Sequence, residues 1–193
     1  YDPKRPVICM DELPFQKLKD IIDSLPPEPG KVERVDYEYE RKGTCSIFIF
    51  FEPLTGWRYV FVRERRTNAD FAECVREVLE QHFPDAETIR LVLDNLSTHT
   101  PAALYQTFEA PVARELTKRI EWNYTPKHGS WLNMAECELS VLSRQHLHQR
   151  IPTIEKIQEI ASLWAEKRTH KKIKVDWRFT IDDAREKFKR FYH

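Results

Sequence analysis

The stretch from Gly43 to Glu64 reads GTCSIFIFFEPLTGWRYVFVRE, and it decides the fold class. Two runs rich in β-branched and aromatic residues, Cys45 to Phe51 and Trp57 to Val62, flank the turn sequence Pro-Leu-Thr-Gly. Residues of this kind favour strands, whereas proline and glycine favour the turn between them. The stretch therefore predicts a β-hairpin.

Helices and strands alternate after the hairpin. Residues 67–85 have apolar positions at helical spacing, with Asn68 as the expected N-cap and Pro84 as the stop. The later patterns predict a strand at 88–95, a short helix at 101–108, a strand at 119–126, a helix from Trp131, and further helices at 153–172 and 181–191. This order predicts an α/β fold, a mixed sheet flanked by helices, with a C-terminal helical appendix at about 151–193.

The residues before the hairpin form an apolar run, PVICMDE, and then a charged segment that ends in SLPPEPGK. Because its prolines break helices, the segment at about 13–43 is predicted to be a loop or an insertion. The chain has 193 residues and is 41% hydrophobic, which indicates one folded domain. No apolar run approaches the roughly 18 to 20 residues of a membrane span, so we expect no membrane partner.

Cysteine and charge add weaker expectations. The four cysteines are Cys9, Cys45, Cys74 and Cys137. They lie far apart, each within an apolar strand or helix pattern, and none forms a C-x-x-C pair, which favours buried free thiols over disulfides or zinc ligands. His146 and His148 lack nearby cysteines and are expected on the surface. From Arg144 onward there are 13 Lys and Arg against 7 Asp and Glu, leaving 18 against 24 before it. A basic C-terminal part suits phosphate, although ordinary charged helix faces explain the same imbalance.

Two aspartates follow apolar runs at which strands are expected to end. Asp11 lies in VICMDE and Asp94 in LVLDN. Functional residues often lie at the carboxyl ends of strands, but aspartate is also a common turn residue, so neither position alone is strong evidence. If the two strands are neighbours, the carboxylates repel unless a cation lies between them. Oxygen ligands of this kind suit Mg²⁺ or Mn²⁺.

The helix expected from Trp131 supplies two more acids, Glu136 and Glu138. At 100° per residue Glu138 falls near the apolar face and Glu136 on its flank. A metal ligand must remain accessible to substrate, which favours Glu136. The alternative is a capping box, with Asn133 as the N-cap and Glu136 three residues later. Local sequence alone leaves these two interpretations of Glu136 nearly balanced.

These acidic segments resemble the three motifs of DDE transposases, specifically the mariner-superfamily transposases of bacterial insertion sequences. The second segment is similar to the motif D-N-x-x-x-H, with Asp94, Asn95 and His99. The third is similar to L-N-x-x-E, with Leu132, Asn133 and Glu136. The resemblance runs through nearly the whole chain.

This resemblance implies a ribonuclease-H-like fold and cut-and-paste transposition. Asp11, Asp94 and Glu136 would be the catalytic residues and would bind two Mg²⁺ ions, with Mn²⁺ as a substitute, for cleavage at transposon ends and strand transfer into target DNA, usually at a TA step. It also implies a homodimer on DNA in a bacterial cytoplasm.

The chain departs from the family pattern in two ways. The 41 residues between Asp94 and Glu136 exceed the usual spacing, which suggests an insertion around 108–118. The N-terminal region that reads transposon ends is also missing. The chain therefore resembles one isolated catalytic domain over 1–193.

Neighbouring residues have alternative roles. Glu12 is a weaker ligand candidate, because adjacent strand residues face opposite sides of a sheet. His99 either orients the site or contacts phosphate, or else caps the helix near Pro101. Asn95 is expected to support the end of its strand. Residues expected to contact DNA phosphate are Lys127 and His128, and the basic cluster Lys167, Arg168, Lys171, Lys172 and Lys174.

Two other functions fit parts of the same pattern. One is a ribonuclease-H-like nuclease that cuts DNA without joining it. The other is an inactive domesticated DNA-binding domain, whose signature would be the loss of an acid, and all three acids are present here.

Overall fold

A five-stranded sheet with strand order β3-β2-β1-β4-β5 forms the centre of the protein. The structure is a computed structural model that describes residues 1–21, 38–127 and 129–189. The strands are β1 (Val7–Asp20), β2 (Tyr39–Glu52), β3 (Trp57–Arg63), β4 (Ile89–Leu93) and β5 (Ile120–Tyr124). The strands β1, β2 and β3 pair antiparallel, whereas β4 runs parallel to both β1 and β5. The sheet is therefore mixed, as the sequence predicts.

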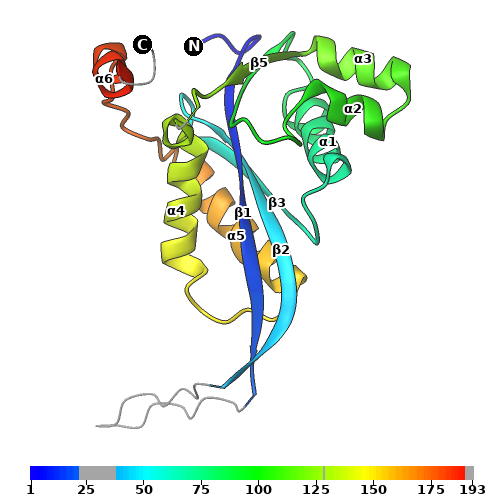
Figure 1. Cartoon of the computed structure of the whole chain (residues 1–193), viewed down its shortest axis with the longest axis vertical. Helices are drawn as coiled ribbons and strands as arrows, with labels where there is room; N and C mark the ends of the chain where they lie inside the picture. The colour runs from blue at the N-terminus through cyan, green and yellow to red at the C-terminus, as the bar shows by residue number, and fades with distance from the viewer. Residues whose placement is uncertain (22–37, 128, 190–193) are drawn as a thin grey trace.

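Helices cover both faces of this sheet (Figure 1). One side carries α1 (Asn68–Glu77) with its π-helical continuation Val78–His82, α2 (Pro101–Thr107) and α3 (Ala110–Lys118). The other side carries α4 (Met134–His146), which follows a 3₁₀ turn at Ser130–Leu132, and α5 (Ile154–His170). The last helix, α6 (Ile181–Phe188), lies apart from the sheet.

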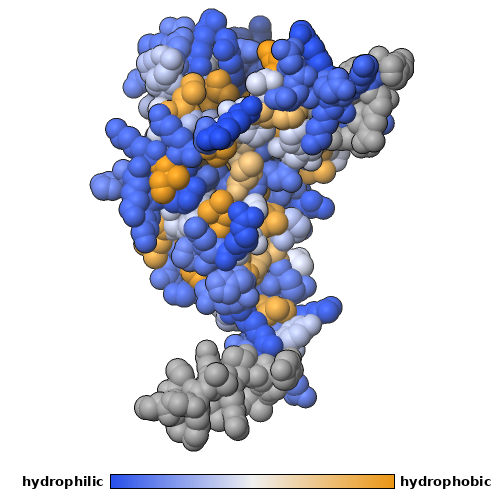
Figure 2. Space-filling view, turned by 90° about the vertical axis from the view of Figure 1, so that its left-hand side faces the viewer, coloured by the Kyte–Doolittle hydropathy of each residue, from blue (hydrophilic) through white to orange (hydrophobic). Residues whose placement is uncertain are grey.

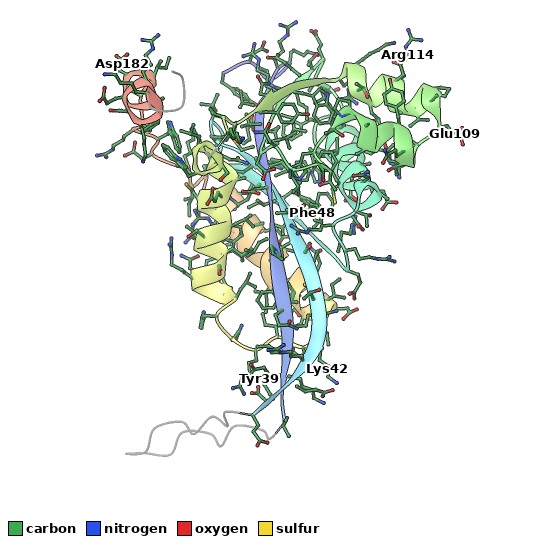
Figure 3. The ribbon with its side chains drawn as sticks, viewed as in Figure 1. Tyr39, Lys42, Phe48, Glu109, Arg114 and Asp182 are labelled. Atoms are coloured by element: carbon green, nitrogen blue, oxygen red, sulfur yellow. The ribbon has the colours of Figure 1, made fainter. Side chains whose placement is uncertain are left out.

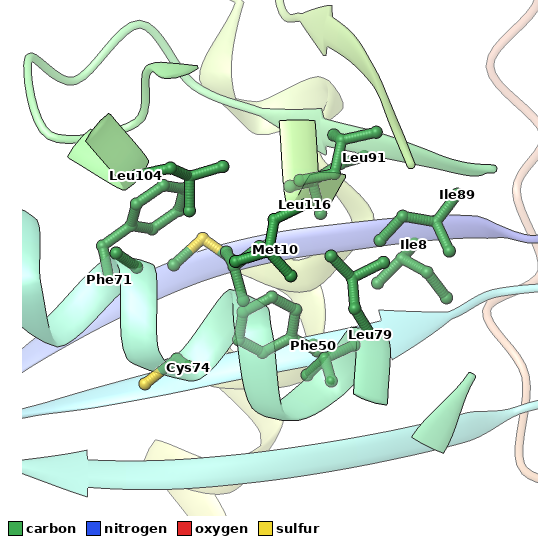
Figure 4. Close-up of a cluster of buried hydrophobic side chains, with 14 of the residues drawn as sticks. Ile8, Met10, Phe50, Phe71, Cys74, Leu79, Ile89, Leu91, Leu104 and Leu116 are labelled. Carbon is green, nitrogen blue, oxygen red and sulfur yellow. The ribbon is translucent and has the colours of Figure 1, made fainter. Parts of the chain in front are cut away.

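Two apolar layers hold these helices on the sheet. Side chains of Ile8 and Met10 belong to the layer under α1, α2 and α3, together with Phe50 and Phe71 (Figure 4). Cys9, between Ile8 and Met10, belongs to the opposite layer with α4 and α5. Successive residues of a strand point to opposite faces, so β1 contributes to both layers. Phe48 lies near the middle of the sheet (Figure 3) and is fully buried.

The hairpin predicted from Gly43 to Glu64 is present as β2 and β3, and Gly56 closes its turn with φ +82°. That conformation is ordinary for glycine and strained for other residues. A Cβ at Gly56 would also lie 2.9 Å from the carbonyl oxygen of Ile173. Glycine is required here because the turn packs directly on the backbone that follows α5.

The first two strands are longer than the sequence patterns indicate. β1 continues to Asp20 and β2 begins at Tyr39, so both ends of the segment 13–43 are paired strands. Tyr39 and Lys42 mark the far end of this two-stranded ladder (Figure 3). The proline cluster lies outside the described residues, and an insertion in this segment stays a prediction.

Three local expectations are wrong. The N-cap of α1 is Thr67 rather than Asn68, because Asp70 completes a reciprocal capping box with Thr67. The helix α5 is part of the core rather than of an appendix, since its Ile157, Ala161, Trp164 and Ala165 are buried in the layer beneath the sheet. Cys137 is exposed, whereas the other three cysteines are buried. It lies about 200° around α4 from the buried Ala135 and Leu139.

The outer surface is mainly hydrophilic on the face that includes α4 (Figure 2). His146 and His148 are exposed, as expected. Among the described residues, no helix combines the length and the apolar character needed to cross a membrane. The segment 108–118, which the sequence suggests is an insertion, forms α3 and the residues just before it.

Candidate catalytic site

The register between β1 and β4 brings Asp11 and Asp94 together. Cys9 is paired with Val92, so two residues further along each strand Asp94 is level with Asp11 and on the same face. β4 ends at Leu93, one residue before Asp94. Asp11, by contrast, lies within β1 rather than at its end, because β1 stays paired with β2 and Asp11 faces Ile49 there. Asp11 borders open space because its neighbour β4 stops.

Asn133 places the helix that carries Glu136. Its side chain accepts a hydrogen bond from the backbone N–H of Ala135 at 3.1 Å and donates one to the carbonyl of Met10 at 2.7 Å. The first contact caps α4, and the second ties the start of α4 to β1 next to Asp11. Because Asn133 is fully buried, both contacts are protected from water.

The capping-box interpretation of Glu136 is not what the structure shows. The backbone N–H of Asn133 donates to the carbonyl of Ser130 at 2.7 Å, so it has a partner other than the Glu136 carboxylate. Glu136 is exposed, whereas Glu138 is buried. The flank and face positions deduced from helical periodicity are therefore confirmed.

The three acids line one pocket of about 430 Å³, which we call the carboxylate pocket. Its lining residues are Asp11, Glu12, Leu13, Asp94, Ser130, Glu136, Leu139, Ser140, Ser143 and Arg144. Burial, together with the charges of Asp94 and Glu136, raises the pKa of Asp11 to about 6, although a hydrogen bond from the Glu12 N–H opposes the rise. The three carboxylates thus share one electrostatic environment.

The donor set of this pocket fits hard divalent cations. Its candidate ligands are carboxylate oxygens, which are the ligands that Mg²⁺ and Mn²⁺ prefer. Within the described residues, no three His, Cys, Asp or Glu side chains are arranged as a finished metal cluster. Because a cation offsets the repulsion between neighbouring carboxylates, binding of a divalent ion would draw these side chains together.

His99 orients Asp94 from inside the protein. It is fully buried, and its Nδ1 lies 2.6 Å from Oδ1 of Asp94. Burial lowers the pKa of His99, but the carboxylates of Asp94 and Glu12 outweigh this and raise it to about 9. The hydrogen bond from His99 in turn lowers the pKa of Asp94. The imidazolium therefore keeps Asp94 ionised.

The two other roles considered for His99 do not fit its position. The N-cap of α2 is Thr100, so His99 is not the cap. Burial also keeps its ring away from any phosphate. The neighbouring Asn95 donates to the carbonyl of Thr125 at 2.7 Å, which ties the end of β4 to the end of β5.

Glu12 borders the carboxylate pocket, but its carboxylate contacts Arg66 and His99. Its side chain is 5% exposed, and its carboxylate lies 3.2 Å from Arg66 and 3.6 Å from Nε2 of His99. A second negative charge beside His99 strengthens the imidazolium that holds Asp94. Glu12 thus supports the site through His99.

Glu138 has two partners that the sequence does not indicate. Its carboxylate lies 2.8 Å from Nε of Arg58 on β3 and 2.8 Å from a guanidinium nitrogen of Arg168 on α5. Both guanidinium groups also lie over the ring of Trp164. A charged residue near the apolar face of a helix indicates that it has an oppositely charged partner. The sequence does not show which residues these partners are, because β3 and α5 are distant from Glu138 in the chain.

The structure separates the basic residues expected to contact DNA. Lys127 is exposed and lines a second pocket of about 250 Å³ with Asp94, Asn95, Leu96, Thr125, Pro126 and Ser130; we call it the Lys127 pocket. His128 lies outside the described residues. Exposed lysines at and after the end of α5 border neither pocket: Lys167, Lys171, Lys172 and Lys174. Arg168 is committed to Glu138.

Comparison with known proteins identifies the family of this chain. A family model for DDE superfamily endonucleases matches residues 6–158, which include Asp11, Asp94 and Glu136. The chain therefore belongs to the DDE superfamily endonucleases, and the resemblance drawn from its acidic motifs is confirmed at this level. None of the curated protein sequences compared with the chain matches it.

Solved structures with the same fold include two complexes of the Mos1 transposase. The Mos1 mariner paired-end complex with Mn has a TM-score of 0.50 and 16% identity, over 86% of this chain and 52% of that chain. The Mos1 Strand Transfer Complex has a TM-score of 0.53 and 14% identity, over 86% and 50%. This chain spans about half the length of those chains. At these identities the likeness concerns the fold, and it confirms the ribonuclease-H-like fold.

Proposed function

We propose that the chain is the catalytic domain of a mariner-type transposase. In this proposal it cleaves DNA at transposon ends and joins the freed 3′-hydroxyl to target DNA, in a cut-and-paste reaction directed to TA steps. The observation that carries the proposal is the meeting of Asp11, Asp94 and Glu136, from three distant segments, in one open pocket. The family match and the Mos1-like fold support it.

Each acid would hold metal from a different element. Asp11 is presented by β1, Asp94 by the end of β4, and Glu136 by the first turn of α4. Bound Mg²⁺ or Mn²⁺, two ions per site, would activate water or a 3′-hydroxyl and stabilise the leaving oxygen. No protein nucleophile is required for this chemistry.

The other residues of the site keep the ligands in place. His99 donates to Asp94 and leaves its other oxygen available, while Asn133 fixes the start of α4 against β1. Ser130 and Asp94 border both the carboxylate pocket and the Lys127 pocket, so a DNA strand at the metal site has space on either side. In this proposal two copies of the protein act together on paired DNA ends.

The test is metal-dependent cleavage of DNA, measured on a supercoiled plasmid and on a duplex that carries a transposon inverted repeat, so that cleavage is detected even without recognition of transposon ends. We expect nicking by the wild-type chain in Mg²⁺ or Mn²⁺ and none in EDTA. Asp11→Asn, Asp94→Asn and Glu136→Gln should each reduce cleavage by at least about a hundredfold, because each removes a charged ligand. Cleavage that persists in all three variants would show that the carboxylate pocket is not the catalytic site.

A second assay separates this proposal from a nuclease that cuts without joining. Pre-cut ends with a free 3′-hydroxyl are incubated with a supercoiled plasmid and Mg²⁺. A transposase produces joined molecules, and sequencing of the junctions reads the target preference. Cleavage without any joined product would favour the nuclease.

A further inference from the structure

The carboxylate pocket and the Lys127 pocket adjoin. Asp94 and Ser130 line both, so the two hollows meet where the carboxylates lie. One is bounded by β1 and α4, the other by the loops after β4 and β5. A chain-like ligand centred on Asp94 would therefore extend into both hollows.

One face of α4 forms the wall of the carboxylate pocket. Glu136, Ser140 and Arg144 follow one another at intervals of four residues, and Ser143 lies beside them. Residues four apart lie on the same face of a helix. From Glu136 to Arg144 this face extends about 12 Å along the helix axis, at 1.5 Å per residue. This face of α4 therefore extends from the proposed metal ligand Glu136 to the positively charged Arg144.

Arg144 is the cation among the residues that line the carboxylate pocket. It is exposed, and its recorded contact in the described part of the chain is the hydroxyl of Ser140 at 2.9 Å, with no carboxylate in ion-pair distance. Four acids line the same pocket, but none of them forms an ion pair with Arg144, so its guanidinium is available to another anion. Lys127, which lines the second pocket, is also exposed, and the described residues place no ion-pair partner beside it.

We propose that the two pockets form one groove for a single DNA strand, in which Arg144 binds a backbone phosphate on one side of the scissile phosphate and Lys127 binds one on the other. This inference rests on the proposed function and adds the path of the strand. Phosphates are repelled by the four acids, so a strand that crosses them needs cations on both sides as well as metal at the centre.

The distance along α4 gives the expected position of the Arg144 contact. A span of about 12 Å along the helix axis is longer than one nucleotide of an extended strand, so the Arg144 contact is expected a few nucleotides, rather than one, from the scissile phosphate. Lys127 borders the pocket that begins at Asp94 itself, so its phosphate should lie nearer to the scissile position and on the opposite side.

The experiment compares the full chain with Arg144→Gln, Lys127→Gln and a matched control, Arg114→Gln. Arg114 is exposed on α3, on the other side of the sheet from α4 (Figure 3). Binding to the inverted-repeat duplex is measured by fluorescence anisotropy in Ca²⁺ at several salt concentrations. Arg144→Gln and Lys127→Gln should each weaken binding by about tenfold and make the salt slope shallower by about one. Arg114→Gln should leave both unchanged.

A phosphate scan assigns the contacts to positions. Each backbone phosphate is replaced in turn by a neutral methylphosphonate, and the loss of affinity is recorded for the wild type and both variants. The wild type should be sensitive on both sides of the scissile phosphate. Arg144→Gln should lose sensitivity a few nucleotides away on one side, and Lys127→Gln should lose it on the other.

The outcomes separate this inference from the proposed function. If the wild type cleaves the duplex in Mg²⁺ while Arg144→Gln binds like Arg114→Gln, the strand path is wrong and the transposase proposal stands. Loss of sensitivity on the same side in both variants would also overturn the path. A wild-type chain that neither binds nor cleaves DNA in Mg²⁺ or Mn²⁺, as duplex or as supercoiled plasmid, would overturn both proposals.

Discussion

Replacing Glu138 by glutamine should destabilise the whole domain. The substitution keeps the shape of the side chain and removes its negative charge, which lies between Arg58 and Arg168 at 2.8 Å from each. The side chains of Glu138 and Arg58 are 2% and 0% exposed, so water cannot replace the lost charge. Burial already lowers the pKa of Arg58 to about 10, and Glu138 is what opposes this.

The expected cost follows from that burial. Removing one partner of a buried ion pair typically costs about 3–5 kcal/mol, because the remaining charge is left uncompensated. Domains have unfolding free energies of about 5–15 kcal/mol, so this loss is a large share of the total. For a chain of this size it corresponds to a fall in the melting temperature of about 6–20 °C.

Urea unfolding monitored by circular dichroism measures this cost, and Glu136→Gln is the matched control. Glu136 lies two residues away on the same helix but is exposed, so its substitution should change the free energy of unfolding by no more than about 0.5 kcal/mol. Adding Arg168→Gln to Glu138→Gln should cost less than it does in the wild type, since the two residues are coupled. Equal unfolding midpoints for Glu138→Gln and Glu136→Gln would refute the buried network as a source of stability.

Two further expectations concern α4 and the thiols. Asn133→Ala removes the N-cap and leaves the Met10 carbonyl without its donor, which should cost about 2–4 kcal/mol in urea unfolding. Asn133→Asp keeps the acceptor but places a buried carboxylate against the Met10 carbonyl, so it should also destabilise the domain; wild-type stability in both variants would contradict this role. Iodoacetamide should modify Cys137 before unfolding, and mass spectrometry would locate the label. The other three thiols are buried, and burial raises the pKa of Cys9 and Cys74 to about 12 and that of Cys45 to about 11. Rapid labelling of any of these three in the folded protein would contradict their burial.

Periodic burial explains what the sequence predicts well. The hairpin follows from two β-favouring runs around a turn, and helical periodicity separates the buried Glu138 from the accessible Glu136. Asp94 is correctly placed at the end of its strand because a short apolar run and a polar turn both mark that boundary. These features depend on residues close together in the chain.

Features that depend on pairing between distant segments cannot be predicted from local sequence patterns. The apolar run that contains Asp11 ends there, but β1 continues because β2 supplies hydrogen-bonding partners for polar residues up to Asp20. The partners of Glu138 come from β3 and α5, and the burial of His99 comes from packing against Phe71 on α1. No local pattern encodes contacts of this range.

The continuation of β1 past the end of β4 makes the three metal-ligand candidates unequal in mobility. Asp11 is held in a strand paired with β2, whereas Asp94 begins a loop and Glu136 lies in the first turn of a helix. Local opening is rare in the middle of a paired strand and common at loops and helix ends. Asp11 is therefore expected to be the least mobile of the three residues. Changes in coordination during a reaction cycle, or between cations of different radius, would be accommodated by Asp94 and Glu136.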